Sequence, residues 1–343
     1  MGDTGASIEA VFREESGRIT ASLIRYAGSF DLAEEALQEA LAAALSAWPE
    51  TGIPRNPGAW LTAAARRKLI DEFRKARIRR EKASEIAYSA PAIVEMPEFP
   101  EDDMADDRLR LIFTCCHPAL NREAQIALTL RTLGGLTTTE IARSFLMPEP
   151  AIAQRLVRAK KKIRDARIPY EVPGRQRLAE RLEPVRTVIY LIFNEGYAAT
   201  LGTGLIREDL CAEAIRLGRV LCDLLPGDPE NKGLLALMLL QDSRRAARVN
   251  AAGELITLEF QDRSKWNREQ IRQALELLGS EAPAGRYGLE ACIALLHAVA
   301  PVPEATDWRR IAELYGVLAR LIPSAVIELN RAVAVAMAEG FES

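Results

Sequence analysis

The chain has 343 residues, with 45 Lys and Arg against 48 Asp and Glu and a formal net charge of −3. Its length predicts two or three domains with ample core, and a content of 48% apolar and 27% charged residues excludes a disordered chain. No uncharged apolar stretch of about 18 residues occurs, so we expect no membrane-spanning helix. The first residues contain neither a basic nor an apolar signal segment, which argues against secretion.

Cysteine and histidine usage points to a reducing compartment. The five cysteines are odd in number and lack paired CxxC spacing, which favours free thiols over a disulfide framework. With only two histidines, a multi-histidine metal centre is impossible. We therefore expect a cytoplasmic protein that has no metal, no cofactor and no membrane partner.

Charge is segregated along the first half of the chain. Residues 66–82 contain nine basic side chains against three acidic ones, residues 83–107 contain eight acidic and no basic side chains, and residues 154–167 contain seven basic side chains against one. Two cationic patches separated by an acidic spacer are typical of a polyanion-binding protein with two contact modules. Solvated helix faces with no partner are the alternative.

Apolar residues at three- and four-residue spacing predict helices over residues 11–27, 32–48 and 59–82. Asp31 is the expected N-cap of the second helix, and Pro49 is expected to end it. The first cationic patch occupies one face of the third helix. The acidic segment 83–107 contains three prolines and no periodicity, which predicts a flexible linker.

A second group of helices is predicted at residues 108–114, 122–133, 138–145 and 150–166. Thr137 and Glu140 form a capping box that sets the start of the third of these, and Pro150 suits the first turn of the fourth. Two short helices joined by a tight turn, the second of which carries the other cationic patch, describe a helix-turn-helix.

The second half of the chain is also helical in pattern. Helices are predicted at residues 175–192, 207–225, 229–247, 268–278, 288–299, 308–321 and 324–338, with most breaks marked by Pro or Gly. Their alternation of small and large residues is typical of tetratricopeptide-like helix pairs, which stack into a repeat domain with a concave face. The predicted fold class is therefore all-α.

Two stretches in the first half resemble the extracytoplasmic-function (ECF) sigma factors, subunits of bacterial RNA polymerase. The segment Asp31-Leu-Ala-Glu34-Glu35-Ala-Leu37-Gln38-Glu39 is similar to region 2.2, and Trp60 to Arg74 is similar to regions 2.3 and 2.4. Residues 139–142 (TEIA) and 155–159 (RLVRA) are similar to the EIA…RLxRA pattern of region 4. The whole chain resembles the subfamily with a tetratricopeptide-like C-terminal extension.

This resemblance implies four segments: region 2 (residues 1–82), an acidic linker (83–107), a region 4 helix-turn-helix (108–170) and the helical extension (171–343). It implies core RNA polymerase, through its β′ clamp helices and β flap, and promoter DNA as partners. The extension would make an intramolecular contact or bind a further protein, and would adjust activity. Its recurrent stretches include Phe193-Asn194-Glu195-Gly196-Tyr197 and Asp262-Arg263-Ser264-Lys265-Trp266.

The resemblance also assigns roles to individual residues. The polymerase-binding residues would be Asp31, Glu34, Glu35, Leu37, Gln38 and Glu39. The DNA-binding residues would be Trp60, Arg66, Arg67, Lys68, Arg74, Lys75, Arg77, Gln154, Arg155, Arg158, Lys160, Lys161 and Lys162. Two positions depart from the family pattern: Arg67 replaces an Asn, and Leu146-Met147-Pro148 replaces the usual G-[IV]-S turn.

Two other functions are alternatives to this one. A polymerase-independent helix-turn-helix regulator would have no use for the carboxylate-rich face at residues 34–39. A helical-repeat enzyme or scaffold is disfavoured because no nucleophile–base pair, glycine-rich loop or metal spacing occurs, so we expect no catalytic residue. Cys115-Cys116-His117 reads as a buried helix end, and Cys211, Cys222, Cys292 and His297 read as core.

The last predicted helix is apolar on every side between residues 332 and 338. A helix of that kind requires neighbours around it. We expect earlier helices of the extension, a second molecule or further chain beyond Ser343 to cover it.

Overall fold

A computed structural model describes residues 2–84, 104–198, 208–250, 254–279, 283 and 285–340. The described residues form α-helices, short 3-10 turns and one isolated β-bridge, which confirms the all-α class. They divide into two compact units, residues 1–185 and 186–343. The predicted acidic linker lies mainly outside the described residues.

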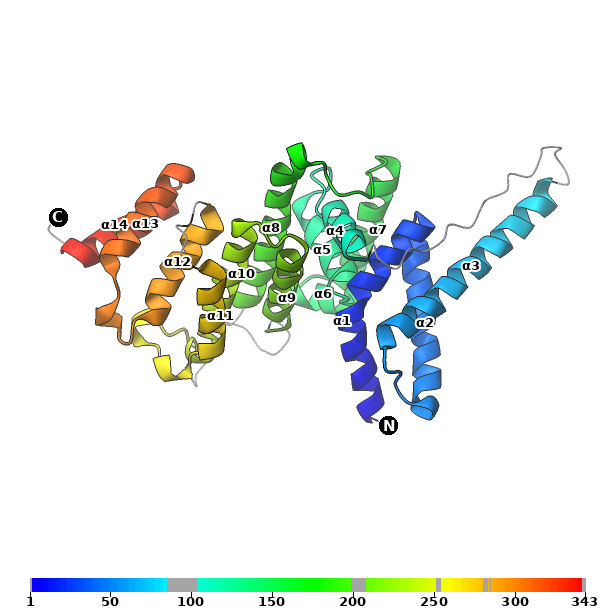
Figure 1. Ribbon diagram of the computed structural model, residues 1–343, viewed down its shortest axis with the longest axis horizontal. Coiled ribbons are helices and arrows are strands. Elements are labelled where there is room, and N and C mark those ends of the chain that lie inside the picture. Colours follow the sequence, from blue (N-terminus) through cyan, green and yellow to red (C-terminus); the bar gives the residue numbers. More distant parts are fainter. Residues whose placement is uncertain are drawn as a thin grey trace. The chain divides into compact units, whose positions relative to one another are not determined.

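The first unit begins with three helices, α1 (Gly2–Ala27), α2 (Phe30–Thr51) and α3 (Pro57–Ser84), that lie side by side (Figure 1). Small residues on α2, such as Ala33, Ala40 and Ala44, are fully or almost fully buried and let the helices approach closely. The indole rings of Trp48 and Trp60 meet edge to face at 5.4 Å and close one end of this core.

Both predicted ends of the second helix are wrong. The N-cap is Ser29, whose hydroxyl accepts the backbone N–H of Leu32 at 3.4 Å, because Ser29 and not Asp31 has the extended backbone of a capping residue. Pro49 lies within the helix, since in the last turn it removes only one N–H donor. The helix ends where Gly52 takes a φ of 79° and donates to the carbonyl of Trp48.

Four shorter helices follow in the same unit: α4 (Met104–Cys115), α5 (Arg122–Thr132), α6 (Thr138–Ser144) and α7 (Glu149–Asp165). The capping box is confirmed: Thr137 accepts the N–H of Glu140 at 3.1 Å, and Glu140 accepts the N–H of Thr137 at 2.6 Å. α6 and α7 pack together as the predicted helix-turn-helix, and α7 also packs on α5.

α8 (Arg175–Ala198) begins in the first unit and ends in the second. The second unit continues with five helices: α9 (Glu208–Leu224), α10 (Pro229–Asp242), α11 (Arg268–Leu278), α12 (Arg286–Val299) and α13 (Trp308–Leu321). α14 (Ala325–Glu339) follows as the last described helix. From α9 to α14 each helix packs on the next one along the chain, as the helical-repeat interpretation predicts (Figure 1).

α10 is the centre of the second unit and packs on α9, α11 and α12. Its closest approach is at Gly233, where a Cβ atom would lie 2.5 Å from the backbone N of Gly288 on α12. The carboxylate of Glu230 accepts the N–H groups of Tyr287 and Gly288, both at 3.0 Å, and so caps the N-terminus of α12.

Earlier helices of the extension cover only one face of α14. One face packs on α13 through Ala334 and Ile327, but Val326, Leu329, Val333 and Met337 are between 45% and 65% exposed. α13 is the described helix on which α14 packs most extensively, and much of the second apolar face of α14 is exposed.

Two glycine substitutions test the close packing of α10 on α12. Gly233→Ala should destabilise the protein by about 1–3 kcal/mol, because the added methyl group meets backbone atoms that cannot move aside. Gly316→Ala in α13 should stabilise it by about 0.5–1 kcal/mol, since the nearest atoms are 3.9 Å or more away and only helix propensity changes. Thermal unfolding measures both, and equal effects would contradict the packing described.

Candidate polymerase and nucleic-acid interfaces

α7 presents a cationic face opposite its buried face. Ile152, Leu156, Ala159 and Ile163 pack into the unit at four- and three-residue spacing. The same periodicity turns Gln154, Arg158, Lys161 and Lys162 outward, and all four are exposed. A helix of this kind can place several cations on phosphates and one amide on a base edge.

A hollow of about 530 Å³ lies beside this cationic face. It is lined by residues of α7 and of the start of α5, including Asn121, Gln154, Arg158 and Lys162. Arg155 lies at its wall, 3.7 Å from the carboxylate of Glu123. Arg155 is therefore partly neutralised, unlike Arg158 and Lys162, for which no described acid is an ion-pair partner.

The turn between α6 and α7 is strained at Leu146. This residue has a φ of 51° and is 78% exposed, so its backbone is in an unfavourable conformation and its apolar side chain is not buried. A left-handed conformation costs a residue other than glycine about 1–2 kcal/mol. The departure from the family's glycine at this turn therefore has an energetic cost.

The basic face of α3 is largely satisfied by acids on its own unit. Lys68 contacts Glu39 of α2 at 2.6 Å, Lys75 contacts Glu72 at 2.8 Å, and Arg74 lies 3.9 Å from Asp71. The hydrogen bond that the Lys75 ammonium donates to Glu72 raises the pKa of that ammonium. Exposed pairs of this kind contribute about 0–1 kcal/mol each, so a polyanion can displace the acids.

The remaining predicted DNA-binding residues on α3 differ in exposure. Arg67, Arg74 and Arg77 are exposed, and Arg67 has no ion-pair partner among the described residues. Arg66 and Trp60 are half-buried, with Trp60 against Trp48. The side chains of α3 beyond residue 78 lie outside the description.

The predicted polymerase-binding residues of α2 fall into three groups. Glu35 and Gln38 are exposed, and Glu39 is held by Lys68. Leu37 is only 4% exposed and belongs to the core of the helix trio, where it has no surface for a partner. Asp31 and Glu34 form ion pairs with Lys160 of α7.

A lysine of α7 joins the two predicted interfaces. The Lys160 ammonium lies 2.7 Å from the carboxylate of Glu34 and 3.0 Å from that of Asp31. The Lys160 side chain is 14% exposed and that of Glu34 is 19% exposed, so water screens this pair weakly. Lys160, which is predicted to contact phosphate, is thus ion-paired with Asp31 and Glu34, which are predicted to contact polymerase.

Other contacts hold the helix-turn-helix segment on the N-terminal helices. The Tyr170 hydroxyl donates toward the carbonyls of Ala21 (2.8 Å) and Asp107 (3.2 Å), and burial raises the pKa of this hydroxyl. α1 packs directly on α4. On α1, a Cβ atom at Gly17 would come within 2.9 Å of the carbonyl oxygen of Leu133.

The Cys115-Cys116-His117 cluster is the buried helix end that the sequence predicts. The Sγ atoms of Cys115 and Cys116 are paired with the hydroxyls of Thr132 (3.2 Å) and Thr129 (3.6 Å). Burial raises the pKa of both thiols, for Cys116 to about 12, so neither is a thiolate at neutral pH. No group of three metal-ligating side chains occurs among the described residues.

Residues of the two recurrent stretches make contacts that hold the extension together. Asp262 caps a 3-10 turn through the N–H of Ser264. Arg263 donates to the carbonyls of His297 (2.6 Å) and Ala300 (2.9 Å) at the end of α12. Tyr197 supports the guanidinium of Arg248 on its ring at 3.6 Å.

Three segments of the chain match known protein families. Residues 11–79 match sigma-70 region 2, residues 110–163 match sigma-70 region 4, and residues 181–282 match a family of unknown function, DUF6596. No solved structure matches the chain. Within the described residues, none of the helices has the length and hydropathy needed to cross a membrane.

Two relatives extend these matches. An uncharacterized protein of Rhizobium meliloti is 44% identical over 355 aligned positions, which cover 100% of this chain and 82% of that protein. A probable ECF RNA polymerase sigma factor, SigI, of Mycobacterium tuberculosis is 27% identical over 177 positions, which cover 51% of this chain and 60% of that protein.

The matches to regions 2 and 4 fall on the helix trio α1–α3 and on α4–α7, the two modules that carry the cationic helices. The Mycobacterium tuberculosis relative carries the name of a probable ECF RNA polymerase sigma factor. The chain belongs to the ECF sigma factors, DNA-binding proteins of transcription initiation, and carries a C-terminal helical extension whose residues 181–282 match the DUF6596 family.

Proposed function

We propose that this chain binds core RNA polymerase through the acidic face of α2 and directs it to a specific class of promoter. The observation that carries the proposal is the presence of two exposed cationic helices, α3 and α7, on two separate modules of one chain. A sigma factor needs such a pair because it must hold an unstacked strand at the minus-ten element and duplex DNA at the minus-thirty-five element.

In this proposal α7 enters the major groove of the upstream element. Arg158, Lys161 and Lys162 contact phosphates, and Gln154 reads a base, since a side-chain amide pairs well with adenine. The rest of the exposed N-terminal part of α7 is poor in polar groups, so direct base readout rests mainly on Gln154. Arg67, Arg74 and Arg77 of α3 hold the phosphates of the separated strand, beside Trp60.

Binding both elements requires the contact at Lys160 to open. The two elements are named for positions about 25 base pairs apart, which is about 85 Å of duplex at 3.4 Å per base pair. α7 and α2 cannot remain 2.7 Å apart at Lys160 and Glu34 while their modules span that distance. The arrangement described is therefore a closed form, which core polymerase opens by competing for Asp31 and Glu34.

The extension has a separate role in this proposal. Its described residues pack into a unit of their own, residues 186–343, and the second half of the sequence is net acidic. An acidic surface is repelled by promoter phosphates, so the extension adjusts the engagement of the sigma regions instead of binding DNA.

Polymerase binding tests the closed form. Lys160→Gln leaves Glu34 without its cation, and Gly17→Ala inserts a methyl group against Leu133, so each should raise the association rate with core polymerase several-fold. Glu35→Lys should instead weaken association, because Glu35 is exposed on the same face and takes no part in the closed contact.

Lys161→Gln is the matched control, since Lys161 is the exposed neighbour of Lys160 on the same helix. Surface plasmon resonance at two salt concentrations separates rate effects from affinity effects. If Lys160→Gln and Lys161→Gln behaved alike, the closed contact would have no influence on assembly. If neither the parent chain nor any variant bound core polymerase, the result would favour the polymerase-independent regulator.

DNA selection tests the roles on α7. Replacing Arg158, Lys161 and Lys162 with Gln should flatten the salt dependence of duplex binding by up to about 3 in log–log slope, since each phosphate contact contributes about 0.9. Gln154→Ala should change the preferred base at one position in sequences selected from a random pool. A changed preference in the triple variant, with none in Gln154→Ala, would reverse these assignments.

Truncation tests the extension. A chain ending after residue 185 keeps Arg181, which donates to the carbonyl of Phe113 at 2.8 Å, and should still unfold cooperatively. We expect its promoter output with core polymerase to differ from that of the full chain. Equal output from a folded truncated chain would show that the extension serves other partners only.

A further inference from the structure

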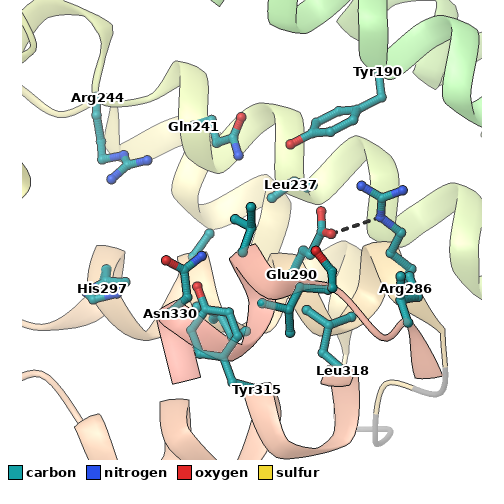
Figure 2. Close-up of a pocket in the computed structure, with 16 residues that line it drawn as sticks. Tyr190, Leu237, Gln241, Arg244, Arg286, Glu290, His297, Tyr315, Leu318 and Asn330 are labelled. Atoms are coloured by element: carbon teal, nitrogen blue, oxygen red, sulfur yellow. Dashed lines mark hydrogen bonds and ion pairs between the residues drawn. The ribbon is translucent and has the colours of Figure 1, made fainter. Parts of the chain in front are cut away.

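The second unit contains a pocket of about 510 Å³ (Figure 2). It is formed by α8, α10, α12, α13 and α14, so its walls come from segments more than 130 residues apart in the chain. This volume is within the range of about 300–1,000 Å³ that is usual for small-molecule sites. Neither the sigma regions nor the recurrent motifs of the extension explain why it exists.

One end of the pocket is electrically neutral. The guanidinium of Arg286 contacts the carboxylate of Glu290 at 2.9 Å, and both belong to α12 (Figure 2). This is the only ion pair drawn among the pocket residues, and its two charges cancel. A ligand gains little from an additional charge at this end.

The other end carries an uncompensated cation, Arg244, which lies on the same side of the pocket as His297 (Figure 2). The only described partner of Arg244 is the hydroxyl of Tyr197, at 3.3 Å. Two nearby arginines are engaged: Arg248 donates to the carbonyl of Tyr197 at 2.7 Å, and Arg263 donates to two carbonyls of the α12 terminus.

His297 adds no charge to this end. Burial, and then the positive charges of Arg244 and Arg263, lower its pKa to about 4, so it is neutral at pH 7. Its ring packs edge-on against Trp308 at 5.1 Å. The pocket therefore holds one unpaired positive charge among its described residues, which suits a monoanion better than a doubly charged phosphate.

Hydrogen-bonding and apolar groups complete the site. The Oε1 atom of Gln241 is buried and has no hydrogen-bond partner among the described residues. A buried acceptor left unpaired is unfavourable, so a ligand donor there is stabilising. Ile293 and Leu318 supply an apolar wall.

We propose that this pocket binds a small organic acid, with its single carboxylate on Arg244, a hydrogen-bond donor on Gln241 and an apolar body against Ile293 and Leu318. A carboxylate matches the planar donors of a guanidinium. The proposal does not depend on the sigma activity. The extension would then have a ligand of its own. Because α14 lines the pocket through Val326, Ile327 and Asn330, the bound ligand would order this helix.

The probes are a graded set of monocarboxylates (propionate, hexanoate, benzoate and indole-3-acetate), their primary amides, inorganic phosphate, and one short peptide with either a free or an amidated C-terminus. Binding to the full chain is measured by saturation-transfer NMR and by the shift in unfolding temperature. We expect at least one of the larger carboxylates to bind and its amide to bind about tenfold or more weakly. Amide-hydrogen exchange of α14 should slow when that acid is bound.

Arg244→Gln should weaken binding of that acid about tenfold or more while leaving the unfolding temperature of the free chain nearly unchanged. Arg309→Gln, an exposed arginine of α13 outside the pocket, is the matched control and should bind like the parent. Binding unchanged by Arg244→Gln would overturn the proposal. Three other results would also overturn it: a preference for phosphate, binding of the free-C-terminus peptide alone, or no binding of any carboxylate at about 10 mM.

Discussion

The ion pair of Lys160 with Asp31 and Glu34 determines what the first unit presents to its partners. It occupies one cation of α7, the helix that we propose binds duplex DNA, and two carboxylates of α2, the helix that we propose binds polymerase. Because both side chains of the Lys160–Glu34 pair are mostly buried, removing either one leaves a poorly solvated charge, so the contact favours the closed form. In the function that we propose, the same groups become available together when the modules separate, and this would couple polymerase binding to exposure of the cationic face of α7.

The division of the chain into sigma regions and extension follows from how each part is held together. The N-terminal helices combine small buried residues with one aromatic pair, whereas the extension relies on close helix approach at Gly233 and on capping by Glu230. Arg186, which is 7% exposed, bonds Asp228 and Asn231 and ties α8 to the start of α10. The described repeat stack ends in α14 with an exposed apolar face, a feature that local periodicity identified but whose surroundings it could not specify.

Most helix boundaries could be predicted from the sequence, because periodicity and capping are local. The Thr137–Glu140 box and the buried Cys115-Cys116 end are examples. The error at Asp31 arose because Ser29, two residues earlier, offers the same capping chemistry, and the error at Pro49 arose because a proline is tolerated in the last turn of this helix. Lys160 was assigned to phosphate because its partner Glu34 lies 126 positions away and leaves no local pattern. The pocket was missed for the same reason: Gln241, Arg244 and Asn330 are ordinary helix residues until five helices bring them together.

Promoter-dependent run-off transcription by core polymerase reconstituted with the full chain tests the central claim most directly. The template is the promoter set recovered by selecting genomic fragments bound by the reconstituted holoenzyme. The account predicts transcripts of defined length that require both the chain and the selected promoter, and that Glu35→Lys diminishes. Specific DNA binding by the chain without association with core polymerase, and no transcript at moderate salt, would contradict it.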